Sequence, residues 1–345
     1  MRVLLVCERS GGHIFPALAI GKAMRQHFEK EKDQIYYFAT SLSFREYLTR
    51  EGFMVFGKSF PLRILIFEIP WRILEALYLI VRLRPQKIIG FGGRDSFFLI
   101  LFSSIFGRDT VIYEPNVKFG KANKVLSFFS KKRLRGFFRE KEDKNAKVIG
   151  VLLRDNIKKI DKNKAKEILG FDERPVIFSF GGSQGSSFLN MIMIELIPHL
   201  RERCQFIHLT GQRDYLEISQ IYNTMKVKSF VRDFYYPMEV LYSTADLVVS
   251  RAGASTLGEI AYYHLPSILI PHPSAGGHQK ENAFYFKERE AACVFLQDKF
   301  LFDEFLRATE ELLFYPGLRQ KMIDNLKKIK LGVDFEEFTK SFDLL

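Results

Sequence analysis

The sequence predicts an α/β fold with two doubly wound domains, each built on a parallel β-sheet. Short apolar runs rich in Val, Ile and Phe alternate with longer amphipathic segments along the 345 residues. This alternation is typical of parallel sheets with right-handed helical crossovers. The order of strand, glycine turn and helix also occurs twice, and the chain is long enough for two domains of ordinary size.

Short runs in both halves carry the residue types of buried strands. In the first half we expect strands at Val3–Cys7, Ile35–Phe38, Lys87–Gly90, Thr110–Tyr113 and Lys147–Ile149. In the second half we expect them at Val176–Phe180, Gln205–Leu209, Lys228–Val231, Leu247–Val249 and Ser267–Ile270. Amphipathic segments lie between most of these runs, and helices are expected at Pro16–Phe28 and Phe188–Leu200.

A charged stretch with few apolar residues, Arg154 to Lys166, separates the two halves. We therefore expect an N-terminal domain at residues 1–153 and a C-terminal domain at residues 154–333. Residues 334–345 are expected to form a helix that packs back on the first domain. Ligands bind beyond the carboxyl ends of the strands in doubly wound sheets, so the glycine turns of both domains are expected at a central cleft.

The composition is that of a soluble globular protein, with 47% hydrophobic and 27% charged residues. The three cysteines, Cys7, Cys204 and Cys293, are too far apart for a disulfide framework or a paired metal site, and they fit a reducing compartment. We see no export signal and no apolar run long enough to span a membrane. The net charge of +12 favours an anionic partner, and without a recognisable motif nucleic acid is not expected to be that partner.

The first glycine turn, Gly11-Gly12, follows the first strand and precedes a helix. Glycines at such a turn let the backbone approach a ligand closely. His13 comes next, and its imidazole is suited to accept a proton from a hydroxyl group near neutral pH. His13 is therefore the candidate catalytic base, with a helix cap as the alternative role, and Glu114 is the reserve candidate.

The second glycine turn follows Phe180 and has the sequence Gly181-Gly182-Ser183-Gln184-Gly185-Ser186. It lacks the Gly-Lys-Ser/Thr ending of a P-loop. Exposed backbone amides at the start of a helix nevertheless form a good cradle for an anion such as a phosphate. The alternative is an ordinary turn between a strand and a helix.

A third constellation leads from the strand before Ser250 through Thr256 into a helix. Small residues and hydroxyl groups at a helix start suit a diphosphate. Glu259 lies one turn inside, where its two oxygens suit a polyol such as ribose, or where it serves as a capping-box residue. The polar loop Gly276–Asn282 follows the next strand and suits sugar hydroxyls. No Asp-x-Asp cluster or His/Cys set indicates a metal, and no cofactor is expected.

Together these three sites resemble those of the bacterial N-acetylglucosaminyltransferases of peptidoglycan synthesis, the MurG family of the two-domain GT-B glycosyltransferases. The resemblance covers nearly the whole chain, from Gly11-Gly12-His13-Ile14-Phe15-Pro16-Ala17 to His278-Gln279 and Asn282-Ala283. Its most specific stretches are Gly181-Gly182-Ser183-Gln184-Gly185 and Ser250-Arg251-Ala252-Gly253-Ala254. The family transfers GlcNAc with inversion from UDP-GlcNAc to an undecaprenyl-linked muramoyl-pentapeptide lipid.

The resemblance implies donor binding in the second domain and acceptor binding in the first. On the donor side it implies roles for Arg154 at the hinge, Ser183, Gln184, Gly185, Ala254, Ser255 and Thr256 around the diphosphate, Phe234 over the uracil, Glu259 at the ribose, and His278 and Gln279 at the GlcNAc hydroxyls. On the acceptor side it implies roles for Ser10, Gly11, Gly12 and Asn116, with His13 as the base.

Several elements depart from the family pattern, and they lie in the acceptor half or at the hinge. They are Glu8-Arg9-Ser10, Gly92-Gly93-Arg94-Asp95-Ser96-Phe97-Phe98, Tyr113-Glu114-Pro115-Asn116 and Gly150-Val151-Leu152-Leu153-Arg154. The sequence therefore specifies a nucleotide-sugar donor more firmly than the acceptor. The alternatives are a GT-B glycosyltransferase with another lipid acceptor such as diacylglycerol, a UDP-GlcNAc 2-epimerase, and a non-catalytic UDP-sugar-binding scaffold.

The segment Phe60–Arg84 combines Trp71 and many aliphatic residues with arginines at positions 63, 72, 82 and 84. Apolar insertion together with arginine contacts to acidic head groups is a pattern of monotopic membrane binding. We therefore expect a peripheral protein that binds the anionic inner leaflet at the cytoplasmic face of the cell membrane. The alternative is a buried helix whose arginines extend along its sides to solvent.

Overall fold

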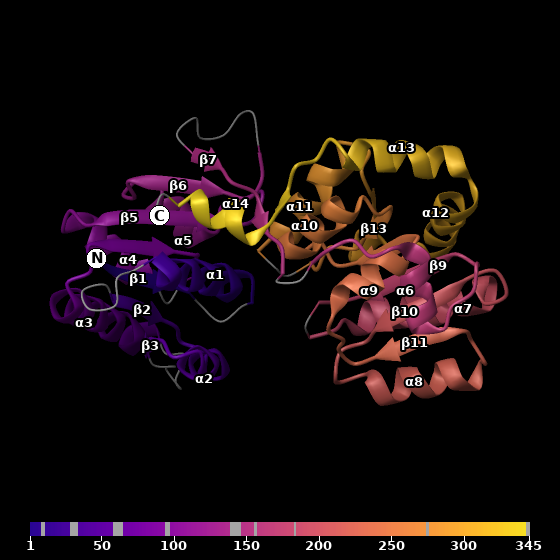
Figure 1. Cartoon of the computed structure of the whole chain (residues 1–345), viewed down its shortest axis with the longest axis horizontal. Coiled ribbons are helices and arrows are strands. Elements are labelled where there is room, and N and C mark those ends of the chain that lie inside the picture. The colour runs from indigo at the N-terminus through magenta and orange to yellow at the C-terminus, as the bar shows by residue number, and fades with distance from the viewer. Residues whose placement is uncertain are drawn as a thin grey trace. The chain divides into compact units, whose positions relative to one another are not determined.

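The computed structural model divides into two units (Figure 1). Unit 1 comprises Met1–Leu152 and Val333–Leu345, and unit 2 comprises Leu153–Gly332. The residues that the structure describes are 1–7, 11–27, 34–57, 65–93, 97–138, 146–154, 157–182, 184–273 and 276–342.

Unit 1 is a doubly wound parallel sheet with helices on both faces. Its strands are β1 (Arg2–Val6), β2 (Gln34–Phe38), β3 (Met54–Phe56), β4 (Lys87–Gly90), β5 (Asp109–Glu114), β6 (Lys132–Arg135) and β7 (Ala146–Val148), in the order β3-β2-β1-β4-β5-β6-β7. The helices are α1 (Gly11–His27), α2 (Leu42–Arg50), α3 (Leu65–Leu83), α4 (Phe97–Ile105), α5 (Lys121–Leu126) and α14 (Phe335–Lys340). A separate two-stranded sheet pairs β8 (Val151–Leu152) with β15 (Gly332–Val333).

The central strand β1 shows why helices cover both faces of this sheet. Successive side chains of a strand point to opposite faces. Val3 and Leu5 therefore pack in the core that includes residues of α1 and α14, whereas Leu4 and Val6 pack with residues of α3 and α4. All four side chains are fully buried. A strand that is apolar on both sides is thus placed between two layers of helices.

The segment that follows unit 2 returns to the core of unit 1. Phe338 in α14 and Phe342 just after it are both fully buried. The ring centroid of Tyr113, in β5, lies 5.3 Å from that of Phe338 and 6.2 Å from that of Phe342. Residues 333–342 are therefore an integral part of unit 1.

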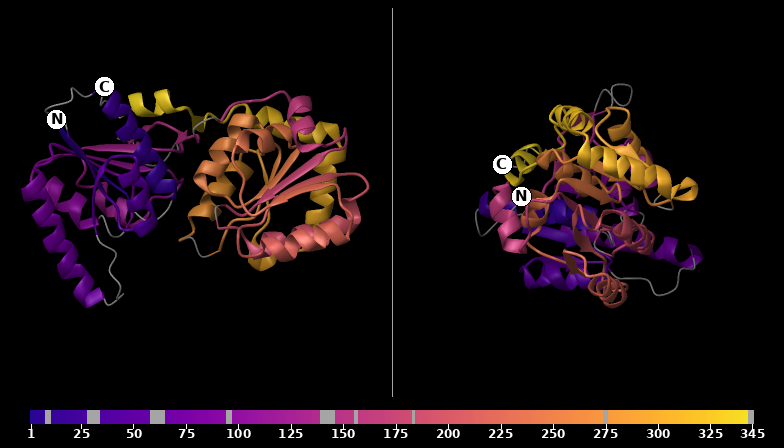
Figure 2. Two further views of the ribbon diagram at one scale, coloured as in Figure 1. Left: turned by 60° about the horizontal axis from the view of Figure 1, so that its bottom comes forward. Right: turned by 90° about the vertical axis from the view of Figure 1, so that its right-hand side faces the viewer.

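Unit 2 is also a doubly wound parallel sheet, and Figure 2 shows helices around both of its faces. Its strands are β9 (Val176–Phe180), β10 (Gln205–Leu209), β11 (Ser229–Arg232), β12 (Leu247–Ser250), β13 (Ser267–Leu269) and β14 (Cys293–Val294), in the order β11-β10-β9-β12-β13-β14. Its helices are α6 (Lys162–Leu169), α7 (Ser187–Leu200), α8 (Tyr215–Thr224), α9 (Met238–Thr244), α10 (Ala254–Tyr263), α11 (His278–Lys287), the short η1 (Gln297–Lys299), α12 (Phe302–Phe314) and α13 (Pro316–Leu326).

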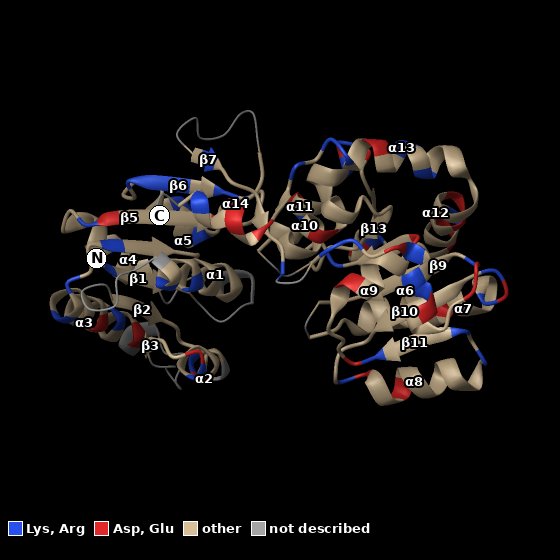
Figure 3. Cartoon of the chain, in the orientation of Figure 1, with Lys and Arg blue, Asp and Glu red and all other residues tan. Residues whose placement is uncertain are grey.

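The predicted fold class is confirmed: every predicted strand is present, with ends that shift by at most one residue. In the two large sheets the sequence pattern missed β3, β6 and β14, and it also missed the two short strands β8 and β15. β6 carries cations at three of its four positions, so it has no apolar run, and it is largely blue in Figure 3. Its Arg135 is nevertheless buried, and the guanidinium carbon lies 4.8 Å from the ring centroid of Phe119.

Helix α3 has apolar residues on two opposite faces. The inner face packs in the core of unit 1 with Ala76, Leu79, Ile80 and Leu83. The outer face carries residues at helical spacing that are 42%, 64%, 54% and 69% exposed, namely Trp71, Leu74, Tyr78 and Val81. We call these four residues the α3 outer stripe. None of the helices in the described part of the chain combines the length and the hydropathy of a membrane span.

Arg72 does not belong to the surface that the α3 outer stripe forms. Its side chain is only 4% exposed, and its Nη1 lies 2.6 Å from Oε2 of Glu75 in an ion pair. The prediction that Arg72 contacts lipid head groups is therefore wrong, because burial and this pairing keep its guanidinium inside unit 1. Arg82 and Arg84, at the end of α3, are exposed as that prediction requires.

Candidate active site

The topological switch point of unit 2 lies between β9 and β12, which are neighbours in the sheet although they are far apart in the chain. Ligands of doubly wound sheets bind beyond the carboxyl ends of the strands at such a point. The segments predicted to bind the donor follow β9, β11, β12 and β13, and all the strands of this sheet run parallel. The sequence motifs are thus collected at one edge of one sheet.

The glycine turn after β9 is built from close backbone contacts. A Cβ added to Gly181 would lie 2.5 Å from the backbone of Gly185 and from Ser186. Gly185 has a φ of +73°, and its added Cβ would lie 2.1 Å from the carbonyl oxygen of Thr210. A Cβ added to Gly211 would lie 2.6 Å from the Cα of Gly185. Two loops therefore pack backbone to backbone here, which only glycines allow.

Arg251 joins this glycine turn to two other segments. Its Nη2 donates hydrogen bonds of 2.8 Å to Ser186 Oγ and to Gln297 Oε1, and its Nη1 donates one of 3.0 Å to the carbonyl oxygen of Ile270. Burial lowers the pKa of Arg251 to about 10. Ser186 in turn caps α7, because its Oγ accepts from the amide of Leu189. Arg251 therefore positions the start of α7 against the ends of β12 and β13.

No role for Arg251 was expected from the sequence, although the residue lies inside one of the two most specific motifs. An arginine between a strand and a helix start resembles a ligand-binding cation as much as a structural one. The role of Arg251 was indicated by the small residues around it, because none of them has a side chain long enough to reach from β12 to the glycine turn.

Glu259 is fully buried and sits between a cation and a phenol. Its Oε1 lies 2.8 Å from Nε of Arg154 in an ion pair, and the hydroxyl of Tyr242 donates a hydrogen bond of 2.6 Å to its Oε2. Burial raises the pKa of Glu259, while the charge of Arg154 and the hydrogen bond from Tyr242 oppose that rise. None of the described residues donates a hydrogen bond to Oε1.

The capping-box alternative for Glu259 is wrong. Helix α10 begins at Ala254 after Gly253 as the N-cap, so Glu259 lies well past the third helical position that a capping box uses. Its carboxylate points toward Tyr242 of α9 and Arg154, away from the helix start. The residue is therefore held by neighbouring segments rather than by its own helix terminus.

The first turn of α11 is fastened to the loops beside it. The side chain of Asn282 is buried, and its Nδ2 donates a hydrogen bond of 3.1 Å to the carbonyl oxygen of Ala252. The Oε1 of Gln279 accepts a hydrogen bond of 2.9 Å from the amide of His272. His278 is the first residue of α11 and is half-buried. Of the two residues expected at the sugar hydroxyls, Gln279 thus also shapes the loop before α11.

The remaining predicted donor residues differ in exposure. Phe234 follows β11 and is 56% exposed, so its ring is free to be covered by a ligand. Ala254 and Ser255 are half-buried at the start of α10, and Thr256 is buried. Gln184 is exposed in the glycine turn. Ser183 lies outside the described residues.

On the acceptor side, Gly11, Gly12 and His13 form the first turn of α1, the helix that follows β1 in the chain, and β1 and β4 flank the switch point of this sheet. The structure describes their backbone but not their side chains, and Ser10 lies outside the described residues. The role of His13 as the base therefore stays a prediction.

The reserve base Glu114 is already saturated with hydrogen bonds. Its carboxylate accepts from the amide and the Nδ2 of Asn116, from the amide of Gly120 and from Nδ2 of Asn123, at 2.9 to 3.2 Å. The side chain is only 3% exposed. Glu114 thus orders the loop after β5, and it brings Asn116, the predicted acceptor-binding residue, to a fixed place beside that strand.

Two family models match the chain in sequence. The model of the glycosyltransferase family 28 N-terminal domain matches residues 5–134, and that of the C-terminal domain matches residues 176–334. A relative from Rickettsia bellii is 31% identical over 95% of both chains. The chain belongs to glycosyltransferase family 28. It is therefore an enzyme of the glycosyltransferase class, as the sequence predicted.

Other relatives and solved structures agree with the family. The Rickettsia bellii relative is named a UDP-N-acetylglucosamine–N-acetylmuramyl-(pentapeptide) pyrophosphoryl-undecaprenol N-acetylglucosamine transferase, and so is one from Thermoanaerobacter sp. that is 30% identical over 95% of both chains. The crystal structure of Acinetobacter baumannii MurG has a TM-score of 0.82 at 22% identity and covers 100% of this chain and 99% of its own. The predicted resemblance to the MurG family is confirmed.

The alternative of a 2-epimerase shares the fold alone. A crystal structure of a UDP-N-acetylglucosamine 2-epimerase has a TM-score of 0.62 at 10% identity and covers 94% of this chain and 90% of its own. Its score is lower than that of the MurG structure, and the matching family models are those of glycosyltransferases. The comparisons thus favour the transferase over the epimerase.

Proposed function

We propose that the protein transfers GlcNAc from UDP-GlcNAc to the undecaprenyl-pyrophosphoryl muramoyl-pentapeptide lipid, with inversion at the anomeric carbon. Relatives at about 30% identity that carry this activity in their names match the chain over nearly its full length. The single observation that carries the proposal is the buried carboxylate of Glu259 on α10, the helix that follows β12 at the switch point of unit 2.

The geometry of Glu259 suits a ribose hydroxyl. Buried acceptors almost always receive a hydrogen bond, and the 2.8 Å contact of Oε1 with Nε of Arg154 is an ion pair without hydrogen-bond geometry, so none of the described residues donates one to Oε1. A ribose hydroxyl would supply such a donor, and the positive charge of Arg154 favours the ionised form of the carboxylate. The exposed ring of Phe234 follows β11 at the same sheet edge and is proposed to cover the uracil.

The diphosphate is proposed to lie over the glycine turn and the start of α10. Backbone amides at helix starts carry partial positive charge and bind phosphates without a metal. The same amides would stabilise the negative charge that develops on the leaving UDP. Within the described part of the chain, no cluster of His, Cys, Asp and Glu side chains has the arrangement of a metal site.

Product analysis tests the proposed reaction. Radiolabelled UDP-GlcNAc is incubated with the protein and either the muramoyl-pentapeptide lipid, diacylglycerol or no acceptor. Label in the muramoyl-pentapeptide lipid supports the proposal. Label in diacylglycerol identifies a different acceptor, a 2-epimer of the donor without acceptor identifies an epimerase, and UDP binding with no product in any reaction identifies a scaffold.

A variant pair links this activity to the site. Glu259→Gln keeps the shape but removes the charged hydrogen-bond acceptor, so donor binding is expected to weaken by roughly 1–3 kcal/mol. Glu217→Gln on the exposed face of α8 is the matched control and should leave donor affinity unchanged. Equal affinities in calorimetry for both variants would contradict the ribose role of Glu259.

We further propose that the enzyme works at the cytoplasmic face of the cell membrane and that the α3 outer stripe inserts into the anionic leaflet. A helix whose outer face is apolar gains from insertion, and Arg82 and Arg84 at its end would meet acidic head groups. Of the two interpretations of this segment, the exposed stripe favours membrane contact over a wholly buried helix.

Vesicle sedimentation tests the membrane proposal. Leu74→Glu with Val81→Glu should abolish binding to anionic vesicles while UDP binding stays intact. Leu216→Glu, at a leucine of α8 that is 82% exposed, is the matched control and should have no effect. Salt should weaken binding of the unaltered protein. Identical sedimentation of the double variant and the control would refute the role of α3.

A further inference from the structure

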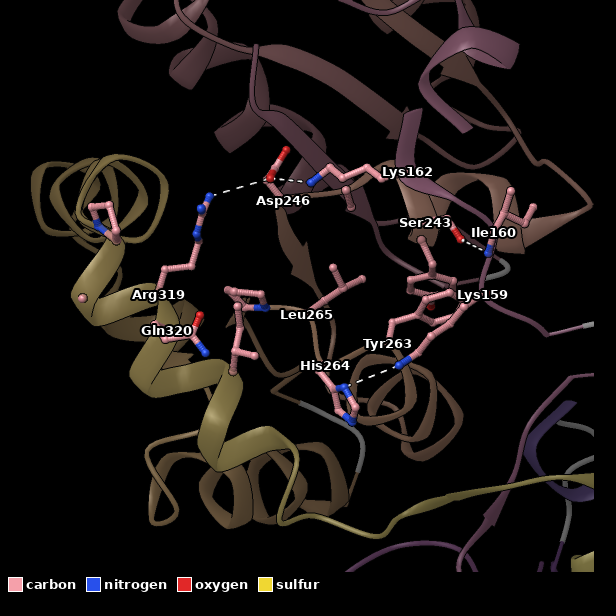
Figure 4. A pocket seen from close by; sticks show the side chains of 16 residues that line it. Lys159, Ile160, Lys162, Ser243, Asp246, Tyr263, His264, Leu265, Arg319 and Gln320 are labelled. Atoms are coloured by element: carbon pink, nitrogen blue, oxygen red, sulfur yellow. Dashed lines mark hydrogen bonds and ion pairs between the residues drawn. The ribbon is translucent and has the colours of Figure 1, made fainter. Parts of the chain in front are cut away.

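Two clusters of polar side chains lie at opposite ends of the strands of unit 2. At the amino ends, Asp246 forms ion pairs with Lys162 and Arg319, at 2.5 and 3.7 Å (Figure 4). Its Oδ2 also accepts a hydrogen bond from the amide of Val176, so this cluster joins α6, α13 and the start of β9. Toward the carboxyl end of β10, by contrast, the fully buried imidazole of His208 is connected to segments predicted to bind the donor.

His208 is placed between Tyr222 of α8 and Asn190 of α7. Its Nδ1 lies 3.1 Å from the hydroxyl oxygen of Tyr222, and its Nε2 lies 2.9 Å from Oδ1 of Asn190. The three residues are at most 1% exposed, so bulk water does not compete for either hydrogen bond. Burial lowers the pKa of His208 to about 3. The imidazole is therefore neutral near neutral pH and carries a single proton.

The amide of Asn190 determines which nitrogen of His208 carries that proton. Its Nδ2 lies 3.0 Å from the carbonyl oxygen of Thr210 and 2.9 Å from Oδ2 of Asp214. Hydrogen bonds, first of all from Ser187, lower the pKa of Asp214, so neither partner of Nδ2 is able to donate. An amide turned the other way would place Oδ1 against two acceptors. Oδ1 therefore faces His208, which donates from Nε2, and the phenol donates to Nδ1.

The carbonyl oxygen of Thr210 belongs to a loop that contacts two of the segments predicted to bind the donor. Thr210 and Gly211 follow β10, and a Cβ added to Gly185 of the glycine turn would lie 2.1 Å from the Thr210 oxygen. The amide of Gly211 donates a hydrogen bond of 3.0 Å to the carbonyl oxygen of Asp233, the residue before Phe234. This loop thus meets both the turn proposed to bind the diphosphate and the segment proposed to cover the uracil.

We propose that His208 is a positioning residue for the nucleotide-sugar donor. A binding site keeps its geometry only where the groups behind it are themselves locked by packing and hydrogen bonds. The imidazole fixes the amide of Asn190, and that amide holds the carbonyl of Thr210 against the glycine turn. Without a donor at Nε2, the amide is free to turn and the cradle for the diphosphate loses its shape. The inference rests on the proposed function, because it concerns the same donor site.

Two conservative variants separate the two nitrogens of His208. The amide nitrogen of glutamine reaches about as far from the backbone as Nε2, whereas that of asparagine reaches only as far as Nδ1. His208→Gln should therefore still donate to Asn190 and bind UDP within about twofold of the unaltered protein, and His208→Asn should bind it about tenfold or more weakly. For His208→Asn the KM for UDP-GlcNAc should rise while the KM for the acceptor lipid stays unchanged. A smaller fraction of folded protein would not produce that split.

Tyr222→Phe is the matched control, because it removes the other hydrogen bond of the same buried imidazole. Tyr222→Phe and His208→Asn both lose a buried hydrogen bond, so both should have a lowered melting temperature. The donor at Nε2 stays in place in Tyr222→Phe, and its affinity for UDP should match that of the unaltered protein. Calorimetry is carried out at a temperature at which all the variants are folded.

Nitrogen NMR of the isotope-labelled, ligand-free protein tests the tautomer. The signals of His208, assigned by their loss in His208→Gln, should show a proton on Nε2 and none on Nδ1 near neutral pH. A proton on Nδ1 overturns this inference alone. It is also overturned if His208→Asn binds UDP as tightly as Tyr222→Phe, or if His208→Gln binds it as weakly as His208→Asn. An unaltered protein that binds no UDP would overturn the proposed function, and this inference with it.

Discussion

Replacement of Tyr242 by Phe isolates the hydrogen bond that holds Glu259. The phenol donates to Oε2 over 2.6 Å, and the acceptor is a fully buried carboxylate. Phe keeps the ring, whose centroid lies 5.4 Å from that of Phe178 and 5.1 Å from that of Tyr263. The lost interaction is therefore a single charged hydrogen bond, which is worth about 1.5–3 kcal/mol. The free energy of unfolding should fall by that amount at neutral pH.

The loss should depend on pH, with a sign that follows from the pKa of Glu259. Burial raises this pKa in the folded state above its value in the unfolded chain. The stability that protonation of Glu259 contributes is therefore fully present below the unfolded-state pKa and is lost as pH rises through the folded-state pKa. Tyr242 opposes the rise in the pKa, because its hydroxyl bonds the carboxylate. Without that hydroxyl the pKa rises further, so the variant loses more stability than the unaltered protein as pH rises above the ordinary pKa of a glutamate.

Urea unfolding followed by circular dichroism at several pH values measures both effects. Tyr285→Phe, at a half-buried tyrosine of α11, is a control for the loss of a phenol. Calorimetry with UDP provides the functional readout, since a displaced Glu259 should also weaken donor binding. A stability loss that is the same at every pH would refute the coupling between Tyr242 and the charge of Glu259. No loss at any pH would refute the hydrogen bond itself.

Three further outcomes are expected. Gly185→Ala should destabilise unit 2 and abolish UDP binding, because the added Cβ would overlap the carbonyl oxygen of Thr210. Gly182→Ala should introduce only backbone strain, because the space around that position is open. Equal melting temperatures and UDP affinities for the two variants would contradict the loop packing. His13→Ala should lower turnover about 10²–10⁴-fold at unchanged donor affinity, and nearly normal turnover would assign the residue to a helix cap. Turnover should persist in excess chelator, and a loss that magnesium or manganese restores would contradict a metal-independent mechanism.

The strands were predictable because both faces of each sheet are covered. A strand such as β9 is buried at every position and therefore appears as an uninterrupted apolar run. β6 was not predicted because its buried position 135 holds an arginine, which packs against the ring of Phe119, and not an apolar residue. Burial of one arginine and exposure of another depend on tertiary packing, which also explains why Arg72 was assigned to the surface.

The donor motifs were predictable because glycines and small residues mark places where a backbone must approach a ligand or another loop. The residues that hold the site in shape were not. Tyr242 lies on a different helix from Glu259, and only the fold brings its hydroxyl to the carboxylate. Arg251 was visible as part of a motif, but its three partners come from segments that are distant in sequence.

The place of residues 333–342 has a consequence for how the protein is made. Translation completes unit 2, a continuous stretch of chain, before it supplies Phe338 and Phe342 to the core of unit 1. Domains near the amino terminus usually fold first during synthesis, but unit 1 must wait for its last pieces. Until then the apolar surface around Tyr113 lacks the packing of Phe338 and Phe342. Chaperones should therefore bind mainly the first half of the chain during synthesis. A chain truncated after unit 2 would have one folded unit and one unit with an exposed apolar core.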